Sequence, residues 1–321
     1  MTKVLLSAAF IVATGICFVP PVGAGEYSPS DTTKVVILGS GTPLPDPHRR
    51  GPAVAVIVNG QPYIVDAGEG IWRATGAATP RFGGQVEALE APNLNHFFLT
   101  HLHVDHIIGL PAILLHPWSM GNQVRLEPAH VYGPPGTDEL VAYILKAYRP
   151  AIDEFVHGPA QKSDTAWRSV GHVVSGPGLV YEDDNVRVEA FETKHAGFPL
   201  TLAYRFTTPD RVVTISGDTI PCAGIEAASR NADVLVHEVY GLDGLANAPW
   251  GGADIESKKK SMSLYHTSTE ELALLAGKVR PGLLVLYHEQ NYSDDPEANV
   301  KEIRRFGYQG PLVSSKDQEI Y

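Results

Sequence analysis

Apolar and polar positions along this chain follow two periods, which divide it into strand-like and helix-like segments. Short apolar runs bounded by turn residues predict strands at 34–38, 53–58, 63–66, 96–99, 186–191, 200–206, 212–216, 234–237 and 283–287. Apolar residues spaced three and four apart predict helices at 107–116, 137–148, 223–230, 269–279 and 296–306. No repeat or low-complexity linker separates these segments. The pattern therefore predicts one mixed α/β domain over residues 25–321.

The first 24 residues have a different pattern. Lys3 precedes an apolar stretch over residues 4–19, and two prolines and a small-residue run ending at Ala24 follow it. This order predicts a secretory signal peptide over 1–24, cleaved after Ala24, and hence a periplasmic or secreted protein. A retained membrane anchor is the alternative, but the apolar run is short for a transmembrane helix, which needs about 20 residues. We therefore expect no stable membrane anchor.

Composition and charge narrow the range of partners. With 321 residues, 44% hydrophobic and 19% charged, the chain has the composition of an ordinary globular protein. Its net charge of −11 disfavours nucleic acid as a partner unless a dedicated basic patch exists. Cleavage after Ala24 would leave Cys222 as the one cysteine, so no intrachain disulfide could form. A homodimer is compatible with this composition.

Four side chains that can bind metal lie within six residues, directly after the apolar run 96–99. They are His101, His103, Asp105 and His106. In an extended stretch His101 and His103 point to the same side, while Asp105 and His106 follow at the turn into the next helix. Imidazole together with carboxylate suits zinc, with manganese or iron as substitutes. A polar surface loop is the alternative, but three histidines and an aspartate at this spacing favour a metal site.

The motif His-x-His-x-Asp-His resembles the signature of the metallo-β-lactamase superfamily of hydrolases. Three further candidates each follow a predicted strand, in the order that the superfamily would require: His195, Asp218 and His288. The resemblance implies an α/β fold of the four-layer αβ/βα sandwich type, with two zinc ions at one edge between two sheets. It assigns His101, His103 and His195 to one zinc, Asp105, His106 and His288 to the other, and Asp218 as the bridge. We expect Asp105 to act as a catalytic residue as well.

Two more motifs resemble the transfer-RNA-processing endonucleases of the RNase Z branch and the secreted arylsulfatases related to them. One is residues 35–43, Val-Val-Ile-Leu-Gly-Ser-Gly-Thr-Pro, followed by two arginines; the other is the run that begins at His266, together with Glu238. Ser268 and Glu271 form a capping box, so His266 lies just before a helix N-terminus, which favours an anion. The resemblance implies that His266 donates a proton to the departing ester oxygen and that Glu238 orients it. The alternative is that His266 is a solvated loop residue.

One segment departs from the tRNA-processing pattern. Those enzymes carry an arm that grips tRNA, and the corresponding stretch here, 152–184, has six acidic residues against two basic ones, Lys162 and Arg168. Such a segment cannot neutralise a run of phosphates. We therefore predict an exported dinuclear zinc hydrolase that cleaves small anionic esters, an aryl sulfate or a phosphodiester, by attack of a metal-bound hydroxide. The alternatives are an RNase Z-like nuclease, a lactone or β-lactam hydrolase of the same fold, and a non-catalytic zinc-dependent binding module.

Overall fold

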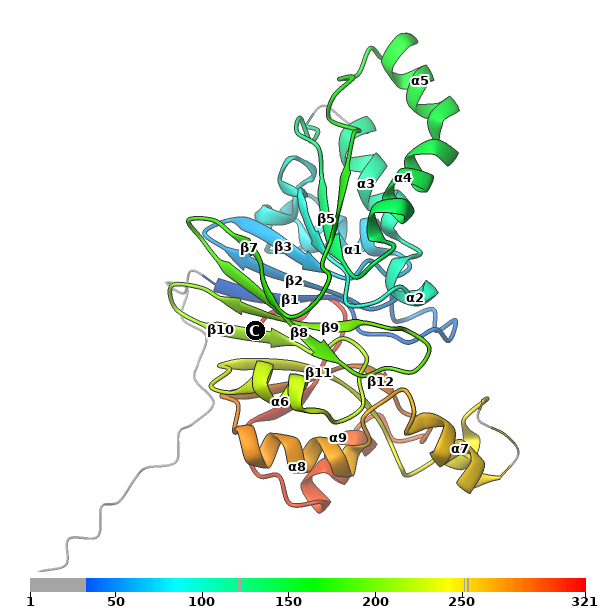
Figure 1. The fold of residues 1–321 in the computed structure, drawn as a ribbon, viewed down its shortest axis with the longest axis vertical. Helices are drawn as coiled ribbons and strands as arrows, with labels where there is room; N and C mark the ends of the chain where they lie inside the picture. The colour runs from blue at the N-terminus through cyan, green and yellow to red at the C-terminus, as the bar shows by residue number, and fades with distance from the viewer. Residues whose placement is uncertain (1–32, 121–122, 251, 253) are drawn as a thin grey trace, which may run out of the picture.

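Two β-sheets packed face to face form the centre of the molecule (Figure 1). The computed structural model describes residues 33–120, 123–250, 252 and 254–321, so the predicted signal peptide lies outside the described residues. The first sheet contains, in spatial order, β1 Thr33–Gly39, β2 Ala53–Val58, β3 Gln61–Val65, β4 His96–Phe98, β5 His130–Gly133 and β6 Val170–Val173. The second contains β13 Leu312–Ser314, β12 Leu283–Gln290, β11 Val234–Tyr240, β10 Val212–Ile215, β9 Thr201–Thr207, β8 Arg187–Thr193 and β7 Gly178–Glu182.

Helices cover the outer face of each sheet. The helices that follow strands of the first sheet are α1 Ile71–Ala78, α2 Val104–Ile107, α3 Leu110–Ser119, α4 Thr137–Ala147 and α5 Arg149–His157. Those of the second half are α6 Ala223–Ser229, α7 Ile255–Met262, α8 Thr269–Val279 and α9 Ala298–Arg305. One hydrophobic cluster joins α1, α3 and α4 to the first sheet, and another joins α6, α8 and α9 to the second. The predicted four-layer αβ/βα sandwich is confirmed.

The apolar runs read as continuous because these strands are buried on both faces. Along β1, Val35 and Ile37 point into the cluster between the sheets, whereas Val36 and Leu38 point to the helices. Every residue of β2 is buried as well. A strand covered on both faces needs apolar side chains at every position instead of alternate ones.

Several predicted elements match the structure closely, and several were missed. The predicted strand 53–58 is β2, and the predicted helix 269–279 is α8 with the predicted capping box between Ser268 and Glu271. The single helix predicted over 107–116 is wrong in its bounds, because α2 ends at Ile107 and α3 begins at Leu110. The prediction did not include β5, β6, β7, β13, α1, α5 and α7.

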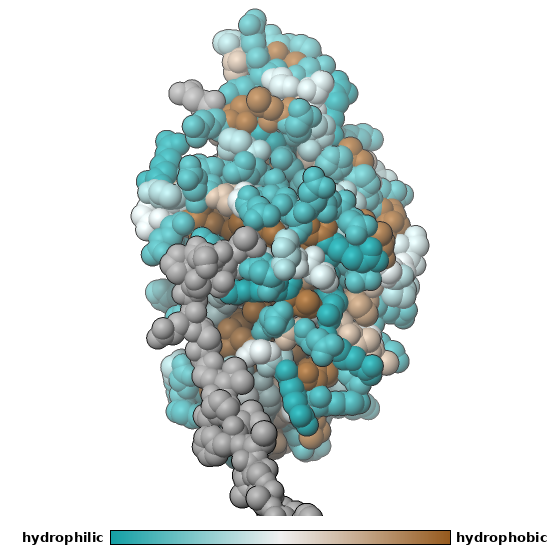
Figure 2. Space-filling view, turned by 90° about the vertical axis from the view of Figure 1, so that its left-hand side faces the viewer, coloured by the Kyte–Doolittle hydropathy of each residue, from teal (hydrophilic) through white to brown (hydrophobic). Residues whose placement is uncertain are grey.

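The face of the molecule seen in Figure 2 is mainly polar. In the view of Figure 2, hydrophilic side chains cover most of the visible face and apolar ones form small separate patches. Within the described residues no helix has the length and apolar content that a membrane span requires.

Candidate metal centre

The seven predicted metal ligands meet at one edge of the sandwich, although they come from both halves of the chain. His101 and His103 follow β4, Asp105 and His106 lie in α2, His195 follows β8, Asp218 follows β10, and His288 lies in β12. Since β10, β11 and β12 run parallel and β8 has the same direction, their carboxyl ends reach the same edge of the sheet. Ligand atoms of these residues form overlapping groups in which all atoms lie within 4.8 Å of one another.

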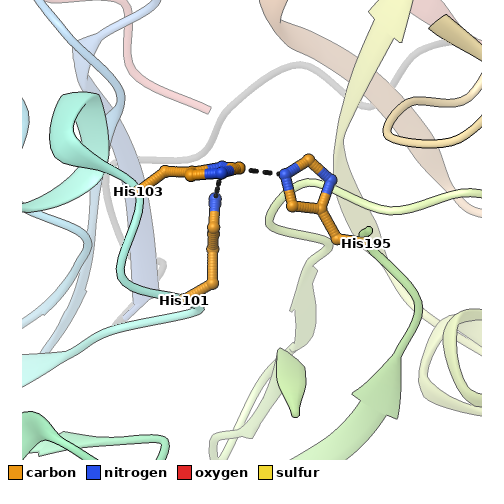
Figure 3. A group of neighbouring side chains, drawn as sticks. All are labelled: His101, His103 and His195. Carbon is orange, nitrogen blue, oxygen red and sulfur yellow. Dashed lines mark hydrogen bonds between the residues drawn. The ribbon is translucent and has the colours of Figure 1, made fainter. Parts of the chain in front are cut away.

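We call His101, His103 and His195 the first set (Figure 3). Nδ1 of His103 lies 3.1 Å from Nε2 of His101 and 2.9 Å from Nε2 of His195. His101 is fully buried and His195 is 5% exposed, while His103 is half-buried. Three imidazole nitrogens therefore converge on one point.

The second set is Asp105, His106 and His288. Oδ2 of Asp105 lies 3.6 Å from Nε2 of His106 and 3.7 Å from Nε2 of His288. Asp105 and His106 were predicted at a turn before a helix, but they lie inside the short helix α2. His288 was predicted to follow its strand, but it lies within β12 as the extra residue of a bulge, with φ of 45°. The bulge aims its side chain at the site.

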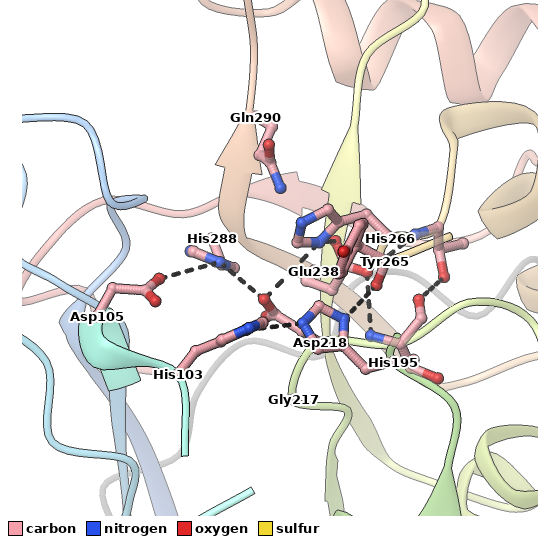
Figure 4. A network of polar contacts seen from close by, with 12 residues as sticks. His103, Asp105, His195, Gly217, Asp218, Glu238, Tyr265, His266, His288 and Gln290 are labelled. Carbon is pink, nitrogen blue, oxygen red and sulfur yellow. Dashed lines mark hydrogen bonds and ion pairs between the residues drawn. The ribbon is translucent and has the colours of Figure 1, made fainter. Parts of the chain in front are cut away.

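Asp218 lies between the two sets (Figure 4). Its Oδ1 is 3.3 Å from Nε2 of His106, and its Oδ2 is 3.2 Å from Nε2 of His288 and 4.0 Å from Nε2 of His101. Gly217 makes this approach possible, because a Cβ there would lie 2.6 Å from Cβ of Thr100 and because φ is 59°. The carboxylate can thus contact an ion in either set.

Hydrogen bonds to the opposite ring nitrogen hold four of the imidazoles with Nε2 toward the centre. Nδ1–H of His195 donates to the Tyr265 carbonyl at 2.5 Å, and Nδ1–H of His288 donates to the Gly41 carbonyl at 2.7 Å. Nδ1 of His101 pairs with Oγ1 of Thr100 at 3.0 Å, and Nδ1 of His106 pairs with a carboxylate at 2.8 Å. Such partners fix both the tautomer and the ring orientation of metal-binding histidines.

The carboxylate behind His106 belongs to Asp66, which our sequence analysis missed as a functional residue. It is buried, has φ of 60°, and accepts hydrogen bonds from the backbone N–H of Thr100 at 2.8 Å and from Nδ1 of His106. The available signal was an aspartate closing an apolar strand, the same signal that identified Asp218. Asp66 therefore links β3 to the motif that begins at His101.

The chemistry of these residues fits two metal ions. Nδ1 of His103 faces the lone pairs of two nitrogens, Nε2 of His101 and Nε2 of His195. It can donate at most one proton, so at least one of these two nitrogens has no hydrogen-bond donor there. Nitrogens around a tetrahedral zinc lie about 3.3 Å apart, close to the spacing of the first set. Nε2 of His106 in the second set and Oδ1 of Asp218 between the sets are buried without a hydrogen-bond partner among the described residues. A cation in each set would satisfy these atoms.

The pKa shifts agree with that reading. Burial lowers the pKa of His195 to about 4 and keeps the pKa of His101 well below its ordinary value, so both rings are neutral and free to bind a cation. Burial also opposes charge on His106 and His288, but the negative charge of Asp218 outweighs it, raising the pKa of His288 to about 9. The second set therefore attracts positive charge.

His266 and Glu238 lie beside this centre as a pair. Nδ1 of His266 is 3.3 Å from Oε2 of Glu238 and 3.7 Å from Oδ2 of Asp218. Glu238 is fully buried, which raises the pKa of its carboxyl group, and its Oε1 accepts the backbone N–H of Thr267 at 2.9 Å. His266 is 14% exposed, so it faces the opening of the site. It also forms a possible ligand group with His195 and Asp218.

Comparison with known proteins places the chain in a family. Residues 62–288 match the family described as the beta-lactamase superfamily domain. The chain belongs to this superfamily. It is 33% identical to Ribonuclease Z of Mycolicibacterium paratuberculosis over 255 residues, which cover 79% of this chain and 85% of that protein. Ribonuclease Z of Mycobacterium bovis is 30% identical over the same shares of the two chains.

Solved structures of the superfamily share the fold. The metallo-beta-lactamase fold protein YhfI from Bacillus subtilis has a TM-score of 0.64 and 18% identity, covering 91% of this chain and all of that one. The short form of human tRNase Z has a TM-score of 0.61 and 20% identity, covering 90% of this chain and 98% of that one. The predicted superfamily and its RNase Z branch are confirmed, and with them the prediction of a hydrolase.

Proposed function

We propose that this protein is a metal-dependent phosphodiesterase that works in the manner of its Ribonuclease Z relatives. In this proposal the first and second sets each hold one zinc ion, Asp218 contacts both, and His266 with Glu238 completes the catalytic machinery. Manganese or iron could replace zinc with the same ligands. The support is the convergence of all seven side chains at one edge, together with the unsatisfied nitrogen and oxygen atoms that a cation would pair.

The ions would activate a water molecule for attack and neutralise charge on the phosphoryl oxygens when bound. The chain itself supplies the remaining steps. The inner side of the site is shielded from solvent, because it is formed by three buried residues: Asp218, His101 and His106. Asp105 closes the second set at the exposed side, where the scissile group must enter.

The single observation that carries the phosphodiester assignment is the His266–Glu238 pair. An alkoxide leaving group needs a proton, and a histidine next to a buried carboxylate can supply it. His266 lies on the open side of Asp218, and the capping box of α8 fixes the backbone directly after it. Oε2 of Glu238 lies 3.3 Å from Nδ1 of the ring, which leaves Nε2 to face a departing oxygen.

The name of the curated relatives makes an RNA phosphodiester the first substrate to test. This favours the nuclease that our sequence analysis gave as an alternative, and it counts against the expectation that nucleic acid is not a partner. A second candidate is a small anionic ester, an aryl sulfate or a small phosphodiester. The acidic segment 152–184 favours it, as does the proposed signal peptide over 1–24, which would export the domain 25–321 to the periplasm or medium.

A substrate panel on zinc-reconstituted protein tests the proposal. We expect turnover of bis(p-nitrophenyl) phosphate and of a short RNA, dependent on two zinc ions per chain, with little hydrolysis of lactone or β-lactam. Hydrolysis of p-nitrophenyl sulfate or of bis(p-nitrophenyl) phosphate, with no cleavage of the RNA, would select the second candidate. Protein that binds two zinc ions yet hydrolyses nothing in the panel would instead support a zinc-dependent binding module.

A further inference from the structure

The last residues of the chain form an additional antiparallel pairing beside β1. Backbone hydrogen bonds join Val35 and Tyr321 in both directions at 2.8 and 2.9 Å, and the N–H of Gln318 donates to the Ile37 carbonyl at 2.7 Å. Val36 and Ile320 face each other across this pairing. The C-terminus consequently lies against the first strand of the domain.

Asp317, the residue just before this pairing, contacts the loop that leaves β1. Its Oδ1 accepts the backbone N–H of Ser40 at 2.9 Å and the Ser40 hydroxyl at 2.8 Å. Its Oδ2 accepts the backbone N–H of Arg50 at 2.8 Å and Nη1 of the same arginine at 3.2 Å. The side chain is 8% exposed. One buried carboxylate thus holds both ends of the loop 40–50.

The two ends of that loop are in close contact. The N–H of Gly41 donates to the Arg50 carbonyl at 2.8 Å, and a Cβ on Gly39 would lie 1.9 Å from the Gly51 carbonyl oxygen. The carbonyl of Gly41 in turn accepts Nδ1–H of His288 at 2.7 Å. A continuous series of hydrogen bonds therefore runs from Asp317 through the loop to a residue of the second set.

We propose that Asp317 is a positioning residue for His288. By holding Ser40 and Arg50 it fixes the Gly41 carbonyl, which keeps the His288 ring turned with Nε2 toward the second set. His288 depends on this support because the bulge, with φ of 45°, sets only the direction in which the side chain leaves the strand, whereas the hydrogen bond to Gly41 sets the rotation of the ring. The inference rests on the metal centre proposed above and adds a residue that contacts neither an ion nor the substrate.

The test uses Asp317→Asn, which keeps the size of the side chain but removes the charge and one of its two acceptor oxygens. The matched control is Glu319→Gln in the same segment, whose carboxylate accepts the N–H of Lys316 at 2.9 Å and the hydroxyl of Tyr321 at 2.6 Å without touching the loop. Zinc per chain is measured by mass spectrometry at a series of buffered free-zinc concentrations, and cobalt substitution reports ligand geometry by its visible absorption.

We expect Asp317→Asn to weaken binding of one of the two ions by about 10- to 100-fold, the usual effect of removing a group behind a metal ligand. Glu319→Gln should bind both ions as the unaltered protein does. Ser40→Ala, which removes only one of the four contacts, should shift the same ion in the same direction by less. If Asp317→Asn fails to fold, the zinc affinity of Ser40→Ala still tests the inference.

Double variants separate positioning from a general loss of structure. In a His288→Ala background, Asp317→Asn should cause no further loss of zinc affinity, because the residue through which it acts is gone. In a His195→Ala background it should still weaken the remaining ion. Equal losses in both backgrounds, or unaltered affinity in Asp317→Asn, would overturn the inference. If the unaltered chain itself binds no zinc, the proposed metal centre fails instead, so the two failures are distinguishable.

Discussion

At the scale of single residues, Asp218 is expected to affect the binding of both ions, because among the described residues it is the one carboxylate that contacts both the first and the second set. It lies 3.3 Å from His106 and 3.2 Å from His288, and 4.0 Å from His101. Asp218→Asn should lower zinc content below two ions per chain. It should also reduce the stabilisation by excess zinc, which is about 2.7 kcal/mol for each site at a hundredfold excess over its dissociation constant.

Elemental analysis and thermal unfolding with and without zinc measure both effects. Asp164→Asn is the matched control, since its carboxylate is exposed and pairs with Arg168 at 3.0 Å, away from the predicted ligands. Two zinc ions per chain in Asp218→Asn, with unaltered affinity, would contradict the bridging role.

His266 gives a prediction about catalysis. His266→Ala should retain both zinc ions and lower kcat by about 10²- to 10⁴-fold, the usual contribution of general acid catalysis. The loss should be small for a nitrophenolate, which can leave without a proton, and large for an alkoxide, which must be protonated as it leaves. Glu238→Gln should show a weaker form of the same dependence, because it orients the ring.

Steady-state kinetics on a series of leaving groups, with zinc analysis of each variant, make the test. An equal loss for good and poor leaving groups would show that His266 positions the substrate instead. Loss of a zinc ion would make it a ligand beside His195 and Asp218, a grouping that the geometry also permits.

His237 leads to a prediction about acid stability. Its ring is fully buried, its Nδ1–H donates to the Glu238 carbonyl at 2.6 Å, and burial lowers its pKa to about 4. The folded state therefore favours the neutral ring, whereas the unfolded chain takes up a proton near pH 6.5. The stability from this difference is complete above pH 6.5 and is lost as the pH falls toward 4, by on the order of 1 kcal/mol per pH unit.

In the metal-free protein, His237→Gln should make the unfolding free energy depend less steeply on pH between pH 6.5 and pH 4. Urea unfolding in the presence of a chelator at several pH values measures the slope. His48→Gln, in an exposed loop, is the control and should keep the slope of the unaltered chain. The same slope in both variants would show that burial of His237 is not the cause.

The predictability of the site differs from residue to residue. The spacing of the residues in the sequence was enough to predict the motif from His101 to His106, because neighbours in the sequence must lie close together in space. Asp66 and the Gly41 carbonyl could not be found in that way, because each reaches its histidine across a large sequence separation. The bulge that aims His288 depends on pairing with β11, which no local pattern records.

At the scale of the elements, α8 connects helix stability to the site. Ser268 accepts the N–H of Glu271, and Glu271 accepts the N–H of Ser268, at the helix start directly after His266. Ser268→Ala should lower the unfolding free energy by about 1 kcal/mol. Urea unfolding measures this loss.

Asp254→Ala is the matched control for that measurement. Asp254 caps the short helix α7 by accepting the N–H of Ser257 at 2.9 Å, and Met262 of this helix belongs to a small satellite cluster outside the main core. A helix that can open locally contributes less to the global unfolding transition. Asp254→Ala should therefore lower the unfolding free energy clearly less than Ser268→Ala does. Equal losses would show that α7 unfolds together with the rest of the domain.

The elements themselves were predictable where burial is complete. Strands β1 and β2 are apolar at nearly every position because both faces are covered, and this pattern needs no knowledge of partners. In contrast, β6 and β7 each lie at an edge of their sheet, and none of their residues is buried. Their sequences lack the apolar run that marks a buried strand, so only pairing with β5 and β8 defines them.

At the scale of the whole molecule, the net charge disfavours RNA as a substrate, whereas the names of the relatives favour it. The net charge is −11, and residues 152–184 carry six acidic and two basic side chains, whereas the relatives are named for cutting RNA. Some of these charges are used within the fold: Asp183 accepts the hydroxyl groups of Tyr63 and Tyr181 at 2.6 and 2.9 Å. With six acidic and two basic side chains, the segment does not form a basic surface.

This charge distribution predicts how RNA would be bound if it is a substrate. Because residues 152–184 cannot neutralise a run of phosphates, RNA contacts should be confined to the metal centre and the side chains around it, so a folded precursor tRNA should have a KM no lower than a short single-stranded RNA. Binding should also depend weakly on salt, because the slope of affinity against salt scales with the number of phosphates neutralised. Cleavage kinetics on both RNAs between 50 and about 200 mM salt test this. A KM more than about tenfold lower for the precursor, lost steeply with salt, would mean that another surface of the chain grips tRNA.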